Sequence, residues 1–156
     1  MCGFFSVSNT KKKITYSKEK LDNAANLLKH RGPDKKKTFN HPNLYCKFFR
    51  LKILDLSDRA MQPMTDINKN YVLMFNGEIY NFKELKNDLT KEGFTFKGNS
   101  DSEVLLNLYI SKGTHMLSQL NGIFSFAIWD KNLEQLFLAR DSFGVKPLYY
   151  SVAENR

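Results

Sequence analysis

The sequence predicts an α+β domain built mainly from antiparallel sheets. Runs of strand length that are rich in aromatic and branched residues outnumber the segments with helical periodicity. Two such runs, 123–129 and 134–140, follow each other across a short polar turn, which favours a hairpin and excludes parallel pairing. The length of 156 residues and the hydrophobic share of 42% suit one compact domain with a sizeable core.

The N-terminal part of the chain is expected to fold as strand, helix and strand. Residues 4–8 form a short run of strand-forming residues. Ser17 is a suitable helix cap, and apolar residues at helical spacing over 18–29 predict a helix that ends before Pro33. The apolar run over 44–54, rich in aromatic and branched side chains, predicts a bent strand.

Strand signals return further along the chain. Residues 71–75 predict a buried strand that runs directly into Asn76 and Gly77. This pair tolerates positive φ angles, so a sharp turn is expected there. Residues 147–150 are a candidate for one more strand after the hairpin.

Helices are expected between these strands, each opened by a capping box. Asn81 precedes apolar residues at helical spacing over 82–92, and Ser100 precedes a similar pattern over 101–112. Each cap has a glutamate three residues later, and a glycine follows each helical segment.

The charge of the chain raises the question of nucleic acid. Lys and Arg number 24 against 16 Asp and Glu, a net charge of +8. The lysine runs 11–13 and 35–37 lack the interleaved aromatic residues that stack on bases, so they are interpreted as solvated loops. A nucleic-acid-binding module therefore rests on the net charge alone, and no nucleic-acid partner is expected.

The sequence favours a cytoplasmic location. No apolar stretch approaches the roughly 20 residues that cross a bilayer, and the N-terminus lacks a basic region followed by an apolar one. No membrane partner is expected, and Cys2 and Cys46 are predicted to be reduced thiols. The histidines lack the mutual spacing of a metal site, so no metal is predicted.

Cys2 is a candidate nucleophile. If Met1 is removed, the same residue carries a thiol and a free α-amine. The amine has a reference pKa of about 7.7 to 8.0, so near neutral pH it can accept the thiol proton directly or through water. The structural alternative is a small residue that begins a buried strand.

Six short motifs occur in order along the chain. They are residues 1–4 (MCGF), 31–34 (RGPD), 50–51 (RL), 76–81 (NGEIYN), 100–103 (SDSE) and 140–150 (RDSFGVKPLYY). Together they resemble the glutaminase domain of asparagine synthetases, a class II glutamine amidotransferase, over essentially the whole chain. The resemblance implies the four-layer αββα sandwich of the N-terminal nucleophile hydrolases. It also implies that Cys2 attacks the side-chain amide of L-glutamine, releases ammonia and forms a thioester that water hydrolyses to glutamate.

The resemblance also implies roles for residues around the thiol. The side-chain amide of Asn76 and the backbone N–H of Gly77 would form the oxyanion hole. Arg50 would bind the α-carboxylate of glutamine, and Asp101, with help from Glu78, its α-ammonium. Each role has a structural alternative: a strand arginine that reaches solvent, a simple turn, or an acidic residue at a helix N-terminus.

Further residues complete the implied pocket. Backbone groups around Ile53 and Leu54 would accept the remaining hydrogen bonds of glutamine, and Arg31 would support the pocket. Relatives commonly carry histidine and serine where this chain has Phe48 and Lys52. These differences leave the subfamily and the acceptor of ammonia open.

The resemblance implies a synthetase partner. Family enzymes continue into an ATP-using synthetase domain with a Gly-rich pyrophosphate loop, and no such loop follows Tyr150. The glutaminase domain over 1–156 is therefore expected to work with a synthetase domain on a longer chain or on a separate subunit, and the ending over 151–156 favours a longer chain. ATP and magnesium are expected in that partner and no cofactor in this domain. A homodimer is left open.

Two other functions compete with ammonia supply for asparagine synthesis. The acceptor of ammonia can be another molecule, such as a sugar acid. The domain can also be a catalytically silent docking domain that binds glutamine and retains Met1.

Overall fold

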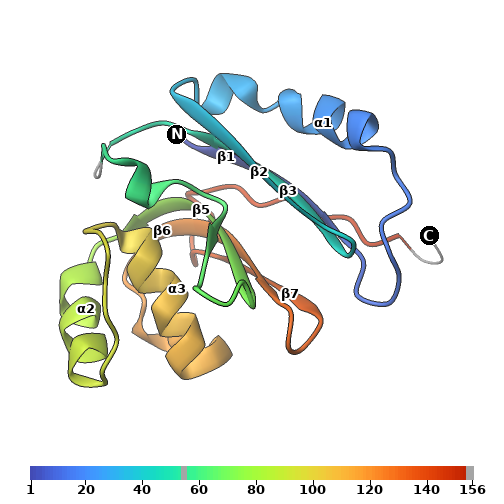
Figure 1. The fold of residues 1–156 in the computed structure, drawn as a ribbon. Helices are drawn as coiled ribbons and strands as arrows, with labels where there is room; N and C mark the ends of the chain where they lie inside the picture. The colour runs from blue at the N-terminus through green and yellow to red at the C-terminus, as the bar shows by residue number, and fades with distance from the viewer. Residues whose placement is uncertain (54–55, 154–156) are drawn as a thin grey trace.

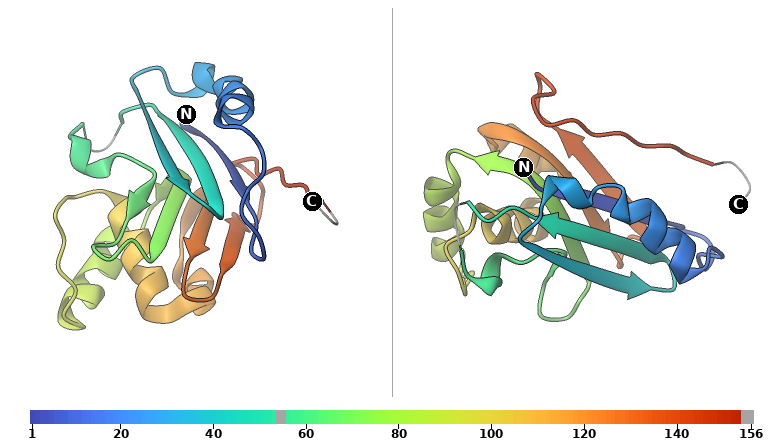
Figure 2. Two further views of the ribbon diagram at one scale, coloured as in Figure 1. Left: turned by 45° about the vertical axis from the view of Figure 1, so that its right-hand side comes forward. Right: turned by 90° about the horizontal axis from the view of Figure 1, so that it is seen from above.

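The computed structural model describes residues 1–53 and 56–153, which form two antiparallel sheets packed face to face between helices. Sheet A has the strand order β1-β3-β2, and sheet B has the order β4-β5-β6-β7. In Figure 1, α1 lies over sheet A, and α2 and α3 cover the opposite side of sheet B. The two further views in Figure 2 show the same layers. The expected four-layer αββα sandwich is confirmed.

The elements have the following bounds. The strands are β1 (Gly3–Ser8), β2 (Lys35–His41), β3 (Leu44–Arg50), β4 (Met64–Thr65), β5 (Tyr71–Ile79), β6 (Gly122–Asp130) and β7 (Gln135–Arg140). The α-helices are α1 (Lys18–Asn26), α2 (Phe82–Lys91) and α3 (Asp101–Lys112). Short 3-10 helices are η1 (Lys29–Arg31), η2 (Asp58–Ala60) and η3 (Gly113–Gln119).

Alternate residues of the strands fill different layers of the core. Val72 and Met74 of β5 pack between the sheets against Leu44 and Cys46 of β3. Leu73 and its neighbours on the other face of β5 pack against α2 and α3. Since side chains alternate along a strand, Asn76 faces the layer between the sheets. Burial of apolar surface in these layers is the main stabilising contribution to the fold.

The strand register brings distant segments to one end of that layer. In sheet A, Gly3 pairs with Phe49, so the N-terminus lies beside the last residues of β3. In sheet B, Asn76 pairs with Ser125. Strand β1 also contacts β5 across the layer. The N-terminus therefore lies next to the end of β5 that carries the 76–81 motif.

Several local predictions are confirmed. The hairpin is β6 and β7, and the helix over 101–112 has the expected bounds. Ser17 accepts a hydrogen bond from Lys20 N, and Ser100 accepts one from Glu103 N, as expected of N-caps. Cys2 and Cys46 are free cysteines in the structure. In the described part of the chain, none of the helices has the length and apolar character of a membrane span.

The expected turn at Asn76 and Gly77 is wrong. Both residues lie inside β5, and Gly77 is not among the glycines with positive φ. The glycine is needed for a different reason, because a Cβ at this position would collide with the carbonyl oxygen of Ile123 and the Cα of Phe124. The small residue allows close packing of β5 on β6.

Asn81 holds the predicted N-cap position of α2, but the capping hydrogen bond predicted for its side chain is wrong. Its side chain makes no capping hydrogen bond to α2. Its amide nitrogen instead donates to Gln119 O at 2.8 Å, and its amide oxygen accepts from Asn121 N at 3.1 Å. Asn81 thus joins the end of β5 to the segment that leads into β6.

Other boundaries differ from the prediction. The lysine run at 35–37 begins the edge strand β2, and only 11–13 lies in an exposed loop. The helix expected over 18–29 ends at Asn26, and the strand expected over 44–54 ends at Arg50. Residues 147–150 form no strand within the described part of the chain.

Candidate active site between the two sheets

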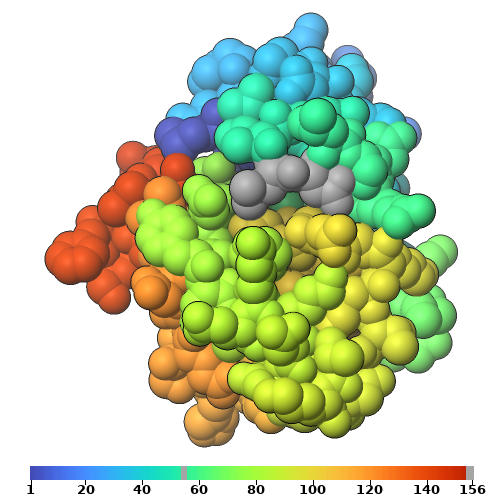
Figure 3. All heavy atoms as spheres, turned by 90° about the vertical axis from the view of Figure 1, so that its left-hand side faces the viewer, coloured from blue at the N-terminus to red at the C-terminus, as the bar shows by residue number. Residues whose placement is uncertain are grey.

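The thiol of Cys2 lies against the backbone of Leu51, the residue that follows β3. Leu51 N donates to Cys2 Sγ at 3.4 Å, and the thiol donates to Leu51 O at 3.6 Å. Figure 3 shows the dark-blue N-terminal residues on the surface, between the blue and teal upper part of the molecule and the green and yellow lower part. The candidate nucleophile therefore lies at the open end of the layer between the sheets.

The 31–34 motif shapes the loop that contacts the thiol. Asp34 N donates to Arg50 O at 3.1 Å, and the Asp34 carboxylate accepts from Lys52 N at 2.8 Å. Asp34 therefore holds the backbone on both sides of Leu51. Gly32 approaches β3 so closely that a Cβ would collide with the Phe49 carbonyl group.

Arg31 lies on the other side of the N-terminus. A Cβ at Gly3 would be 2.9 Å from Arg31 Cβ, so the two residues are in close contact. Arg31 thus packs behind the residue that follows Cys2, where it supports the start of β1.

Arg50 brings a buried positive charge to the site. The residue is only 5% exposed, and its Nη1 donates to Ser57 O at 2.6 Å. It ends β3 on the side that faces the layer between the sheets, since Leu44 and Cys46 at the same alternation pack there. Its charge acts on Cys2, whose thiolate form it favours.

On the opposite wall, the edge of β5 presents a row of backbone N–H groups. The backbone carbonyl of Phe124 accepts a hydrogen bond from Asp141 N, and its N–H donates to the Asp141 carboxylate, so both groups point away from β5. Phe124 and Gly77 therefore lie opposite each other without exchanging hydrogen bonds. Gly77 N–H therefore points to the other edge of β5, like those of Phe75 and Ile79. Side chains of other segments accept from both of these neighbours.

The acceptors on either side of Gly77 are Gln62 and Asp101. Phe75 N donates to Gln62 Oε1 at 2.6 Å, and Ile79 N donates to Asp101 Oδ2 at 3.2 Å. Among the described residues, no side chain accepts from Gly77 N–H. An incoming oxygen can therefore bind between the two occupied positions, close to the Asn76 side chain.

Asn76 supplies a second polar group at the same end of β5. The residue is 7% exposed and faces the layer between the sheets. Ser125 lies directly opposite it on β6, and the Ser125 hydroxyl has no hydrogen-bond partner within the described part of the chain. Asn76 thus brings a buried polar side chain to this end of the layer between the sheets.

The environment raises the pKa of the Cys2 thiol above its usual value. Burial is the largest cause, and the negative charge of Asp101 acts in the same direction. The hydrogen bond with Leu51, the N-terminal ammonium and Arg50 partly oppose it, because each favours the thiolate. A base next to the thiol is therefore needed for efficient attack near neutral pH.

Asp101 begins α3 and is 5% exposed. Burial raises the pKa of its carboxyl group to about 6, although hydrogen bonds from the backbone of Ile79 and Ser102 favour the charged form. The nearby charge of Glu78 raises the pKa further. A ligand cation between these carboxylates would relieve their repulsion.

The remaining predicted residues are placed less closely. Glu78 is exposed on β5, and Ile53 is 68% exposed. Leu54 lies outside the described residues. The structure thus brings the backbone or side chains of Cys2, Arg31, Arg50, Asn76, Gly77, Glu78 and Asp101 to one end of the sandwich.

The 140–150 motif forms a loop beside the N-terminus. The Asp141 carboxylate accepts backbone N–H groups of Phe124, Phe143, Val145 and Lys146. Burial alone would raise the pKa of Asp141, but these hydrogen bonds hold it below its usual value. Lys146 Nζ lies 2.9 Å from Met1 Sδ, so this loop contacts the residue before Cys2.

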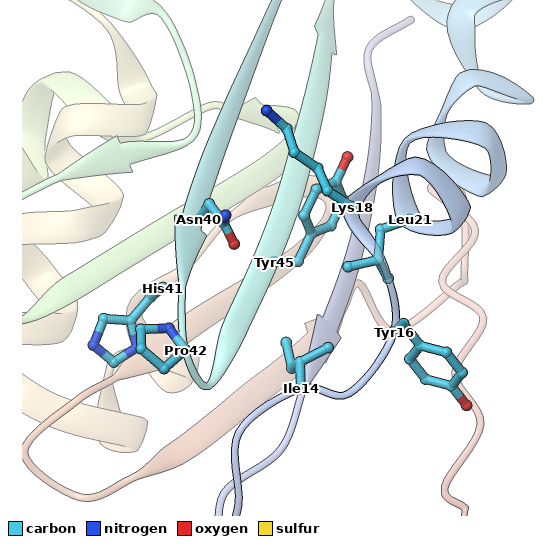
Figure 4. Close-up of a pocket in the computed structure, with 8 residues that line it drawn as sticks. All are labelled: Ile14, Tyr16, Lys18, Leu21, Asn40, His41, Pro42 and Tyr45. Carbon is cyan, nitrogen blue, oxygen red and sulfur yellow. The ribbon is translucent and has the colours of Figure 1, made fainter.

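A separate pocket lies between α1 and the β2-β3 hairpin (Figure 4). It has a volume of about 330 Å³ and is lined in part by Lys18, Leu21, Asn40 and Tyr45. None of the site residues predicted from the sequence lines it. Within the described ranges, no group of three His, Cys, Asp or Glu side chains is arranged to hold a metal ion.

Sequence reasoning missed Gln62 and the backbone role of Asp34. Gln62 is the only polar residue in the apolar stretch 60–64, and this contrast is the signal that could have identified it. Asp34 belongs to the 31–34 motif, but the local pattern does not indicate its backbone role, because its partners Arg50 and Lys52 are distant in sequence.

The αββα sandwich, with a strand that starts at the N-terminus, is the architecture of the N-terminal nucleophile hydrolases. Comparison with known families narrows this class. The family described as "Glutamine amidotransferase domain" matches residues 1–156, and the chain belongs to this family.

Individual relatives agree with this assignment. The chain is 40% identical over 158 residues to asparagine synthetase [glutamine-hydrolyzing] 1 of Bacillus subtilis (strain 168), a match that covers 100% of this chain and 25% of that protein. It is 39% identical to amidase chry2 of Gibberella zeae (strain ATCC MYA-4620 / CBS 123657 / FGSC 9075 / NRRL 31084 / PH-1), over 88% of this chain and 21% of that protein. The chain thus spans a quarter or less of the length of these relatives.

A solved structure supports the fold. Glutamine phosphoribosylpyrophosphate amidotransferase from B. subtilis, complexed with ADP and GMP, has a TM-score of 0.50 and 26% sequence identity. The match covers 62% of this chain and 23% of that one.

Proposed function

We propose that this domain hydrolyses L-glutamine to glutamate and ammonia through a thioester on Cys2, and that the ammonia passes to an ATP-dependent synthetase. The observation that carries the proposal is a half-buried thiol at the same end of the sandwich as the polar edge of β5. Cys2 is held by Leu51 on one wall, and Gly77 N–H points outward between two occupied positions on the other. This is the arrangement that attack on an amide requires.

Cys2 acts as the nucleophile once Met1 is removed. Its α-amine takes the thiol proton, and the sulfur attacks the side-chain carbonyl carbon of glutamine. The amine then gives the proton to the leaving nitrogen, so ammonia departs and a thioester remains. Water attacks the thioester and the C–S bond breaks, which releases glutamate and regenerates the free thiol. The raised pKa of the thiol is the reason why a base on the same residue matters.

The oxyanion of each tetrahedral intermediate binds the Asn76 amide and Gly77 N–H. Both groups are fixed in a strand that pairs with β6 along its whole length, so they need little rearrangement when charge develops. A donor that is already oriented stabilises the transition state more than a mobile one.

The amino-acid end of glutamine is bound by opposite charges. Arg50 binds the α-carboxylate, and Asp101 with Glu78 binds the α-ammonium. Bound ammonium favours the ionised form of Asp101, whose carboxyl group has a pKa of about 6 in the free site. Backbone groups around Ile53 and Leu54 accept further hydrogen bonds, and Arg31 supports the pocket.

The acceptor of ammonia is proposed to be aspartate activated by a synthetase, as the name of the B. subtilis relative suggests. ATP and magnesium belong to that partner domain in this proposal. The name of the amidase relative shows that a domain of this family occurs in proteins with other names, so a different acceptor is the main alternative.

The experiment that tests the proposal is intact-mass analysis before and after treatment with an electrophilic glutamine analogue. We expect loss of Met1 and one adduct, located on Cys2 by peptide mapping and blocked by excess glutamine. Ammonia release from glutamine is measured on the same preparation. Retained Met1, no adduct and no ammonia would instead indicate a silent glutamine-binding domain.

A further inference from the structure

Gln62 replaces a missing strand partner at the edge of β5. Within the described ranges, strand β4 pairs with β5 through Met64 and Thr65, and no described strand pairs with this edge of β5 beyond Leu73. A buried N–H group without an acceptor is costly, and Gln62 Oε1 accepts from Phe75 N at 2.6 Å. Gln62 is itself only 4% exposed.

The other end of the Gln62 amide reaches the first turn of α3. Gln62 Nε2 donates to Ser102 Oγ at 3.2 Å, and Ser102 is 5% exposed. Ser102 follows Asp101, whose carboxylate accepts from Ile79 N. Strand β5 and the start of α3 are therefore joined at two places, with Asn76 and Gly77 between them.

The segment that carries Gln62 is also fixed to sheet A. Lys37 Nζ, on β2, donates to Pro63 O at 2.9 Å, one residue after Gln62. Gln62 is thus anchored independently of β5 and α3. Its amide can hold these two elements at a constant separation.

We propose that Gln62 is a positioning residue for glutamine hydrolysis, which sets the Gly77 N–H and the Asn76 amide relative to Asp101. This inference rests on the proposed function of the site. Glutamine must contact the oxyanion donors at its side chain and Asp101 at its α-ammonium, so the distance between them determines whether the carbonyl carbon lies within reach of Cys2.

An amide is suited to this position because it accepts and donates at the same time. Phe75 N–H requires an acceptor and the Ser102 hydroxyl can accept, so one neutral side chain satisfies both. A hydrocarbon side chain of similar length would leave both partners unsatisfied. An aspartate or glutamate would place a further negative charge near Asp101, whose pKa is already raised by burial and by Glu78.

The test compares Gln62→Met with Tyr45→Phe in the protein carrying residues 1–156. Tyr45→Phe also removes one hydrogen bond of a buried side chain, to Asp22, but on the α1 side of sheet A. For Gln62→Met we expect kcat for glutamine to fall about 10- to 100-fold. Cys2 alkylation by iodoacetamide should stay within about twofold of wild type, because Gln62 does not contact the thiol. Tyr45→Phe should change neither rate.

Hydrogen exchange provides a readout that does not depend on activity. In Gln62→Met, amide protection should fall at least about tenfold over 75–79 and over the first turn of α3, and it should be unchanged there in Tyr45→Phe. If Gln62→Met fails to fold, Ser102→Ala tests the positioning role instead. It should lower kcat and the amide protection of the same segments, each by less than is expected for Gln62→Met.

The outcomes separate this inference from the proposed function. A folded Gln62→Met with wild-type kcat, or with unchanged exchange over 75–79, overturns the positioning role. A parallel loss of glutamine hydrolysis and iodoacetamide reactivity also overturns it, since that indicates general damage to the site. If wild type releases no ammonia, the proposed function fails, and the exchange measurement still decides whether Gln62 holds β5 against α3.

Discussion

The two walls of the candidate site are built in different ways. On the sheet A side, Cys2 and Arg50 meet at the end of β3, where the chain leaves the sheet as a loop. On the sheet B side, Asn76 and Gly77 lie within β5, which pairs with β6 from Tyr71 to Ile79. One wall is held by a loop that backbone hydrogen bonds fix, and the other by a continuous strand.

The two walls therefore have different roles in the proposed reaction. The thiol contacts the backbone N–H and the carbonyl oxygen of Leu51, so its reactivity depends in part on the position of this residue. The polar groups of β5 are held by sheet pairing and by buried side chains, which suits donors that must be oriented before charge develops. We therefore expect changes on the sheet A side to alter thiol chemistry, and changes on the sheet B side to alter transition-state binding or substrate affinity.

Removal of the nucleophile should have the largest effect. Cys2→Ala is expected to lower glutamine hydrolysis by about 10⁴-fold or more, because no other group can form the thioester. The free energy of unfolding should change by about 1 kcal/mol or less, since little volume is lost. Ammonia release and a denaturant titration measure the two effects.

Cys46→Ala is the matched control for this change. Cys46 is fully buried between the sheets, and its pKa is raised to about 12, chiefly by burial. The variant should lose some stability and keep hydrolysis. Activity that survives in Cys2→Ala but not in Cys46→Ala would reverse the assignment of the nucleophile.

Truncation of the oxyanion donor on β5 should have the next largest effect. Asn76→Ala is expected to lower kcat by about 10²- to 10³-fold, with a smaller change in KM, because the lost hydrogen bond strengthens in the transition state. Ser125→Ala is the control, since Ser125 lies directly opposite on β6 and its hydroxyl has no partner within the described residues. Steady-state kinetics that show equal kcat for the two variants would remove Asn76 from the oxyanion hole.

Neutralisation of Asp101 should act on substrate affinity. Asp101→Asn is expected to raise KM for glutamine about tenfold or more, while the amide still accepts from Ile79 N. Thermal stability near neutral pH should not fall, because the buried charge is removed. Equal KM in the two proteins would exclude Asp101 from the ammonium site.

The same carboxyl group predicts a pH dependence. Its pKa is raised to about 6, so it is ionised above that pH and protonated below it. In wild type, kcat/KM for glutamine should therefore fall as the pH drops through about 6. Asp101→Asn should lack this limb of the profile, and an unchanged acid limb would assign it to another group.

Loosening the loop on the sheet A side should have the smallest effect. Asp34→Ala removes the acceptor for Lys52 N, so the Leu51 hydrogen bond to Cys2 should weaken. That bond lowers the pKa of the thiol, so its loss should raise the pKa and slow alkylation by about two- to fivefold near neutral pH. The pH profile of iodoacetamide labelling measures this shift.

Asp66→Ala is a suitable comparison for Asp34→Ala. Asp66 also accepts backbone N–H groups, those of Asn68 and Tyr71, but in the turn before β5. Its loss should leave Cys2 labelling unchanged. Equal slowing in both variants would show that the Asp34 effect is not local to the thiol.

The sequence predicted the features that depend on local patterns. The hairpin of β6 and β7 follows from alternation and turn residues, and the caps at Ser17 and Ser100 follow from side chains that bond within one helical turn. Most candidate site residues came from the order of short motifs, and the structure places Cys2, Asn76 and Asp101 at one end of the sandwich, while their roles stay predictions.

The failures have a common physical reason. Asn76 and Gly77 match a turn signal, but tertiary packing on β6 requires a glycine inside a strand. Asn81 matches a cap signal, but it bonds to a segment about 40 residues away. Gln62 stands out locally only as a polar residue in an apolar stretch, and its partners on β5 and α3 are not indicated by the local sequence. Local sequence patterns do not specify partners that only the folded chain brings near.

The contact of Lys146 with Met1 bears on the timing of synthesis. The two residues are 145 positions apart, so at about 5 to 20 residues per second the ribosome adds Lys146 roughly 7 to 30 seconds after Met1. During that interval the loop at Asp141 has not yet been made in full, so Met1 has no contact with Lys146 and is accessible to an aminopeptidase. In the folded chain with Met1 in place, Met1 contacts Lys146 but stays 47% exposed. Removal of Met1 before the loop is complete therefore breaks no contact, whereas removal from the folded domain breaks the contact with Lys146.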